Sequence, residues 1–127
     1  MKRPSLVAAA LLSTTAALAV PSAAGAATSA CAPETGDWCT SVAERDGRRV
    51  LSTETFSFRG KVRICVTGPK GRTCRAARLR ETKAGTYRAA LSWKRSFPDQ
   101  GRGRYRVTFT PDASGRKLGP TLSFTIR

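Results

Sequence analysis

The sequence predicts an all-β sandwich, and three observations support this fold class. Beyond about residue 26, helical periodicity is nearly absent, and short runs of alternating apolar and polar residues recur instead. Segments with Gly and Pro separate these runs, as the turns of an all-β domain require. Four cysteines in a chain of 127 residues also indicate a small fold braced by disulfides. We therefore expect a sandwich of about six or seven strands.

The first 26 residues have the parts of a cleavable secretory signal helix. Lys2 and Arg3 give a positive beginning, an apolar run follows over 6–20, and the small residue Ala26 precedes the expected cleavage site. The apolar run is shorter than a membrane span, which needs about 20 apolar residues. The chain is therefore predicted to be secreted, with an extracellular mature domain.

A lipoprotein is the alternative, in which Cys31 would be acylated after cleavage. Thr28 is a poor match to the bulky aliphatic residue that such a motif prefers. Lipidation would also leave three cysteines, one of them unpaired. Secretion with all four cysteines in disulfides is the preferred interpretation.

The residues after the signal divide into a loop-like segment and a sandwich. Residues 27–49 are expected to be loop-like, and the sandwich is expected over 50–127. The strands that we expect cover Val50 to Phe58, Lys61 to Thr67, Arg72 to Arg80, Thr86 to Lys94, Arg104 to Thr110 and Leu118 to Ile126.

A hairpin register follows from the turn Gly68-Pro69-Lys70-Gly71. Proline presets the first central residue of a tight turn, and glycine relieves its ends. Symmetric pairing about this turn sets Cys65 opposite Cys74, and opposed residues lie within disulfide reach. We expect this disulfide.

The remaining cysteines, Cys31 and Cys39, are then expected to close a short loop that holds Trp38. A zinc site is disfavoured because the spacings are wider than those of a zinc clamp and the chain has no His. No metal and no cofactor are expected.

One local pattern resembles a known fold family. It runs Leu91-x-Trp93, then Phe97, then Gly101-x-Gly103-x-Tyr105-x-Val107. This pattern resembles the passage from strand E to strand F of immunoglobulin-like domains, where a Tyr forms the tyrosine corner. Val107 stands where such domains usually have Cys. The resemblance covers about residues 50–127 and implies a Greek-key immunoglobulin-like sandwich, without implying a function.

The order of segments TFSFRGKVRICV, TCRAARLR, GTYRAALSW, GRYRVTF and LGPTLSF also resembles small secreted actinobacterial proteins of unknown function. That likeness implies no activity. It agrees with the richness in Ala and Arg.

The chain is strongly basic, with 23 Lys plus Arg against 8 Asp plus Glu. Most cations lie in residues 59–127, the part predicted to be richest in strands. Such a field attracts polyanions. An Arg-rich solvating surface produced by GC-rich coding is the plain alternative.

Strand alternation predicts one cationic sheet face. If Val62, Ile64 and Val66 point inward, their neighbours point outward, and the hairpin register sets Lys61 opposite Arg78, Arg59 opposite Arg80, and Arg63 opposite Ala76. The predicted anion-binding face consists of Arg59, Lys61, Arg63, Arg78, Arg80, Arg104 and Arg106. Like charges directly opposed are destabilising, so an anionic partner is expected.

The expected partner is an anionic cell-wall polymer or polysaccharide. The outward positions carry no aromatic residue, which disfavours specific nucleic-acid recognition by stacking. No amphipathic basic helix suggests membrane insertion, and no membrane span is expected in the mature form.

No catalytic residue is predicted, because the chain lacks His and lacks the G-x-S-x-G and H-E-x-x-H motifs. We expect a non-enzymatic binding module. The alternative is a secreted protease inhibitor that presents Lys70 or Arg72 on the hairpin loop over 67–72, because preorganised loops bind with less loss of entropy.

Overall fold

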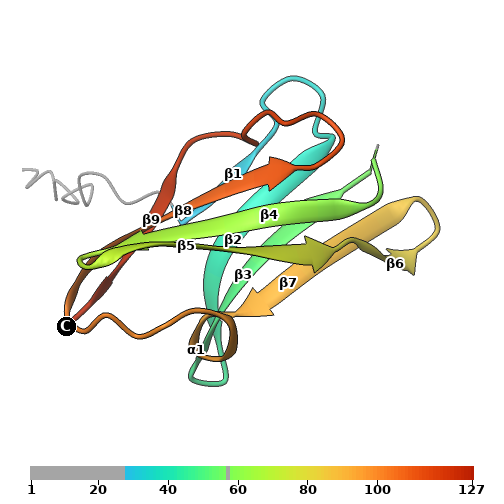
Figure 1. Cartoon of the computed structure of the whole chain (residues 1–127). Helices are drawn as coiled ribbons and strands as arrows, with labels where there is room; N and C mark the ends of the chain where they lie inside the picture. Colours follow the sequence, from blue (N-terminus) through green and yellow to red (C-terminus); the bar gives the residue numbers. More distant parts are fainter. Residues whose placement is uncertain (1–27, 57) are drawn as a thin grey trace, which may run out of the picture.

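The chain folds into two antiparallel sheets, seen here in a computed structural model (Figure 1). The structure describes residues 28–56 and 58–127. The expected signal over 1–26 lies outside the described residues. The strands are β1 (Ser29–Cys31), β2 (Trp38–Arg45), β3 (Arg48–Thr55), β4 (Lys61–Gly68), β5 (Gly71–Arg78), β6 (Arg80–Lys83), β7 (Thr86–Ser92), β8 (Gly103–Pro111) and β9 (Leu122–Ile126). A short helix, α1 (Trp93–Ser96), follows β7. The all-β prediction is confirmed, but the described residues form nine strands where six or seven were expected.

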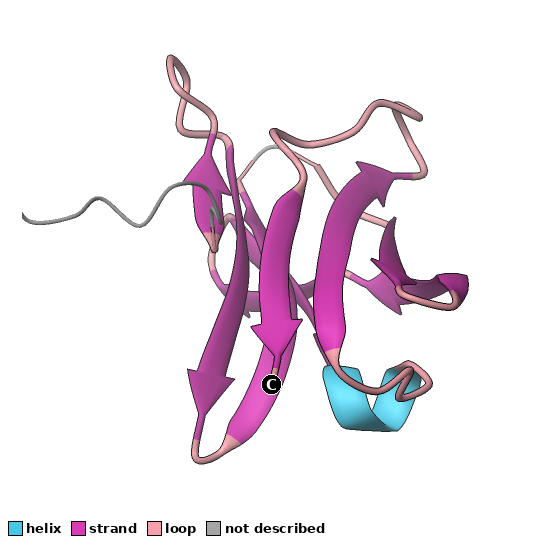
Figure 2. Ribbon diagram, turned by 90° about the vertical axis from the view of Figure 1, so that its left-hand side faces the viewer, coloured by secondary structure: helices cyan, strands magenta, loops and turns pink. Residues whose placement is uncertain are grey.

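Most strands pair with their neighbours in sequence, and the chain passes between the two sheets at three places. One sheet has five strands in the order β1-β2-β3-β7-β6, and the other has four in the order β5-β4-β8-β9. The chain crosses between the sheets after β3, after β5 and after β7. Figure 2 shows α1 at one end of the strands, where the last of these crossings begins. No helix of the described residues is long and apolar enough to span a membrane.

Strand alternation builds the core as the sequence predicted. Val62, Ile64 and Val66 of β4 are buried, and so are Tyr105 and the other inward residues of β8. The ring of Trp93 meets Tyr105 edge to face with centroids 5.3 Å apart, while Tyr105 stacks on Phe124 at 5.1 Å. These aromatic contacts hold the two sheets together near α1.

The predicted hairpin register is confirmed. Lys61 faces Arg78, Arg63 faces Ala76, and Cys65 faces Cys74 across β4 and β5. The disulfide Cys65–Cys74 joins the two strands. The turn and the alternation of β4 were therefore sufficient to set the pairing of this hairpin.

The second expected disulfide, Cys31–Cys39, is also present and closes the turn between β1 and β2. Both cysteines lie in paired strands, because β1 and β2 run antiparallel with Cys31 opposite Cys39. The prediction that 27–49 is loop-like is wrong, since β2 pairs with β3 along its length. The buried inward positions of β2 include the polar Thr40 beside Val42, which hid the alternation.

Further strand boundaries differ from the prediction. The strand expected to end at Phe58 ends at Thr55, and the one expected to end at Lys94 ends at Ser92, where α1 begins. The chain leaves the four-stranded sheet at Leu79, a buried residue whose N–H donates to Gly60 O at 2.8 Å. At the other end, Leu118 precedes β9 and is buried as a loop residue, with its N–H donating to Phe109 O at 2.7 Å. Its apolar side chain alone made Leu118 look like a strand residue in the sequence.

Candidate functional site

The outer face of the β5-β4-β8-β9 sheet is the most strongly charged surface that one sheet provides. Strand alternation turns six exposed cations to this face, and we call them the cationic face: Lys61, Arg63, Arg72, Arg78, Arg104 and Arg106. The four strands contain no Asp or Glu. Every formal charge that these side chains add to the face is therefore positive.

The registers place these side chains in two groups. In the first group, Arg72, Thr67, Arg106 and Ser123 form one row across the four strands. Because neighbouring strands lie about 4.8 Å apart, the backbones of Arg72 and Arg106 are about 10 Å apart. Arg104 lies two residues along β8 from Arg106, a separation of about 7 Å.

The second group lies further along the same hairpin. Lys61 and Arg78 are directly opposed, and Arg63 lies between Ala76 and Thr110 of the neighbouring strands. Opposed like charges cost a few tenths of a kcal/mol or more, about 0.2–1 kcal/mol for cross-strand pairs in general. The disulfide row separates this group from the first.

The cationic face is poorly neutralised within the protein. Arg104 Nη2 donates to Ser123 Oγ at 3.4 Å. The other five side chains make no hydrogen bond or ion pair among the described residues, whose single ion pair joins Arg49 to Glu44 at 2.7 Å. Their donors are available to a partner.

Two residues predicted for this face lie elsewhere. Arg80 begins β6 in the five-stranded sheet, opposite Arg88, because the chain has already changed sheets at Leu79. Arg59 precedes β4, and its Cζ lies 5.0 Å from the centre of the Tyr87 ring on β7. The predicted pairing of Arg59 with Arg80 is therefore wrong.

Arg72 belongs to the face but was missed. The predicted register already set Arg72 opposite Thr67. Thr67 lies four residues after Arg63 on the same strand, so both side chains point to the same face of the sheet. The signal was present in the sequence and pointed to this position.

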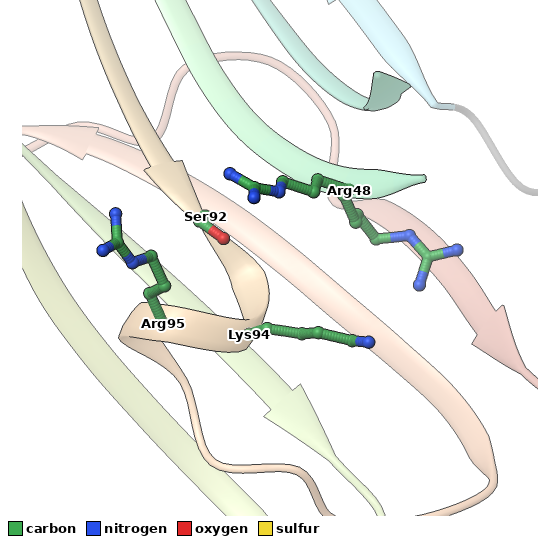
Figure 3. Close-up of a pocket in the computed structure, with 5 residues that line it drawn as sticks. Arg48, Ser92, Lys94 and Arg95 are labelled. Atoms are coloured by element: carbon green, nitrogen blue, oxygen red, sulfur yellow. The ribbon is translucent and has the colours of Figure 1, made fainter. Parts of the chain in front are cut away.

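A separate cationic pocket lies at the end of the sandwich near α1. It encloses about 300 Å³ and is lined by Arg48, Arg49, Ser92, Lys94 and Arg95. Figure 3 shows Arg48 on β3 and Lys94 and Arg95 on α1, with Ser92 between the two elements. This pocket could not be predicted from the sequence, because its residues come from strands and a helix that only the tertiary fold brings together.

The hairpin loop considered for protease inhibition is closed by internal hydrogen bonds. The Lys70 N–H donates to Gln100 Oε1 at 2.6 Å, and Gln100 Nε2 donates to Gly71 O at 3.0 Å. These backbone groups are thus engaged with the loop before β8. In Figure 1 the β4–β5 turn and this loop lie at the same end of the molecule.

Comparisons with protein-family models, curated proteins and solved structures gave no match to this chain. Function is therefore inferred from the chemistry of the chain's own surface.

Proposed function

We propose that this chain is an extracellular, non-enzymatic immunoglobulin-like module that binds anionic cell-wall or matrix polymers through the cationic face. One observation carries the proposal. The face presents six exposed cations on four strands that contain no acidic residue.

The strand order supports the immunoglobulin-like assignment. In that fold one sheet has strands A-B-E-D and the other has G-F-C, which can be extended by C′. The orders β2-β3-β7-β6 and β9-β8-β4-β5 correspond to these two sheets. Tyr105 Oη also donates to Gly101 O at 2.6 Å, the backward hydrogen bond that is typical of a tyrosine corner.

Two disulfides support an extracellular location, because such bonds persist in oxidising compartments. The finding that no described helix could span a membrane is compatible with it. Secretion itself depends on the signal expected over 1–26.

The chemistry of the cationic face favours a polyanion over a neutral partner. An Arg guanidinium can donate two parallel hydrogen bonds to phosphate, sulfate or carboxylate. Binding such groups would also relieve the repulsion between Lys61 and Arg78. The outward neighbours Thr67, Thr108 and Thr110 offer hydroxyls and no stacking surface, which favours polymers recognised by charge.

The protease-inhibitor alternative receives less support. An inhibitory loop offers its backbone to the enzyme in an extended conformation. Here Lys70 and Gly71 are the end of a tight turn, and both are hydrogen-bonded to Gln100.

The proposal is tested by charge reversal with a matched control. The triple variant Arg63→Glu, Arg78→Glu, Arg104→Glu changes the face, whereas Lys83→Glu, Arg116→Glu, Lys117→Glu makes the same change in net charge at exposed positions elsewhere. Binding to purified cell wall and to a soluble sulfated polysaccharide would be measured at low and high salt.

We expect the first triple variant to lose at least about tenfold in affinity, equivalent to about 1.4 kcal/mol, and the control to lose much less. Binding of the natural chain should also weaken as salt rises. Equal losses in the two triple variants would mean that only net charge matters and would contradict a site on this face. Salt-insensitive binding would contradict a polyanion as the partner.

A further inference from the structure

The residues that line the pocket between β3 and α1 favour the binding of a small anion. Four of its five lining residues are cationic, and the fifth is Ser92. No Asp or Glu is among them. Neighbouring positive side chains repel one another, and the cost is lowest when an anion occupies the space between them.

One wall of the pocket is held in place by its neighbours. Arg49 Nη2 donates to Glu44 Oε1 at 2.7 Å, and its guanidinium carbon lies 4.3 Å from the centre of the Phe124 ring. Its side chain is only 16% exposed. A guanidinium fixed in this way loses little conformational entropy when it binds a ligand.

The opposite wall is held as well. Arg75 on the edge strand β5 donates from Nε to Ser96 O at 3.0 Å, which ties the end of α1 to the other sheet. Trp93, the first residue of α1, is buried in the aromatic core. Lys94 and Arg95 therefore project from a backbone that is anchored on both sides.

A second hollow adjoins this pocket and shares Arg49 and Lys94 with it. It encloses about 430 Å³, and Trp93, Ile126 and Asp99 also line it. Trp93 Nε1 is buried and has no hydrogen-bond acceptor among the described residues. Because this nitrogen has almost no exposed surface, the polar groups that a ligand in the hollow can reach are the carboxylates of Glu44 and Asp99, which accept hydrogen bonds from hydroxyls.

We propose that the pocket binds the phosphate of a phosphomonoester, and that the adjoining hollow takes the sugar or polyol that carries it. Four cationic side chains line the pocket, and the carboxylate of Glu44 offsets one of these charges, so the local charge is about +3. A phosphomonoester carries a charge of about −1.5 to −2 at neutral pH. A carboxylate, with one charge, would leave more repulsion unrelieved. Ser92 can donate its hydroxyl to one phosphate oxygen.

This site is independent of the cationic face. Its ligand is a single terminal group in a pocket, whereas the face meets a polymer along a sheet. Either proposal can fail without the other.

The test is an amide chemical-shift titration of the folded natural chain with inorganic phosphate and with glycerol 3-phosphate, against sodium chloride at equal ionic strength. We expect saturable shifts at Arg48, Ser92, Lys94 and Arg95 with both phosphates, and tighter binding of glycerol 3-phosphate. Chloride should leave these residues nearly unshifted.

Two double variants sharpen the result. Arg48→Ala with Arg95→Ala should weaken phosphate binding at least tenfold, and Arg63→Ala with Arg78→Ala should leave it within about twofold. Shifts that chloride reproduces, shifts centred on the cationic face, or equal effects of the two double variants would overturn the pocket site. Glycerol 3-phosphate binding no tighter than phosphate would overturn the role of the adjoining hollow. The shift map of the natural chain decides the matter even if one variant does not fold.

Discussion

The hydroxyl of Tyr105 is expected to contribute more to stability than its single oxygen suggests. It donates to Gly101 O at 2.6 Å and accepts from the Gln100 N–H at 3.1 Å. Tyr105 is 0% exposed. The substitution Tyr105→Phe therefore removes both hydrogen bonds while leaving the ring packing in place.

The expected loss is about 2 kcal/mol of unfolding free energy. Each intramolecular hydrogen bond contributes about 0.5–1.5 kcal/mol net, and a partner left unpaired in a partly buried site adds to the cost. For a domain of this size, such a change lowers Tm by about 8 °C. Stacking of the ring on Phe124 at 5.1 Å should survive the substitution.

The assay is urea and thermal unfolding under non-reducing conditions, with Tyr87→Phe as the matched control. Tyr87 is also buried, but its hydroxyl makes no hydrogen bond to another described residue. The control should therefore change stability by less than about 0.5 kcal/mol. If Tyr105→Phe costs no more than Tyr87→Phe, the hydroxyl does not brace the loop before β8, and the tyrosine-corner argument fails.

Two further predictions concern the β4–β5 hairpin. Replacing both Cys65 and Cys74 by Ser opens a loop with a sequence separation of 9, and chain entropy predicts a loss of about 2.5 kcal/mol in urea unfolding. A loss under about 1 kcal/mol would mean that the turn and β8 already fix the hairpin. Gln100→Ala removes both hydrogen bonds to the turn, so limited proteolysis with trypsin should cut after Lys70 up to about tenfold faster, because local opening becomes easier. An unchanged cleavage rate would show that Gln100 does not hold the turn closed.

The β4–β5 hairpin could be predicted because independent local signals agreed on it. A Gly-Pro turn, an alternating strand and a cysteine on each side all specify one register, and Cys65 does face Cys74. The alternation then placed five of the seven predicted cations on the cationic face. Local signals ended at Leu79, where a buried apolar residue continues the alternation although the chain changes sheets.

Strand β2 and the pocket could not be predicted, for different reasons. Thr40 lies on the inward side of β2, opposite Thr53 of β3, and both are buried. Because these inward residues are polar, the alternation of apolar and polar residues that marks a strand is absent here. The pocket depends on the tertiary packing of α1 against β3, which no periodicity encodes. Arg49 in particular sits beneath the surface because Phe124 of β9 lies under it.

The contrast between the two outer faces argues against composition alone as the cause of the cationic face. Coding bias toward Arg would act on both sheets alike. The outer face of the five-stranded sheet also carries opposed cations, Arg45 with Arg48 and Arg80 with Arg88. Its middle is uncharged, with Ser41 hydrogen-bonded to Ser52 at 2.8 Å and Ala90 beside them. There Glu54 also stands opposite Arg88. The four strands of the other sheet contain no carboxylate, and Asp112 follows directly after β8, where its N–H donates to Lys61 O at 3.0 Å. An excess of Arg accounts for cations on both outer faces, whereas the proposed anion-binding surface also accounts for the lack of Asp and Glu in these four strands.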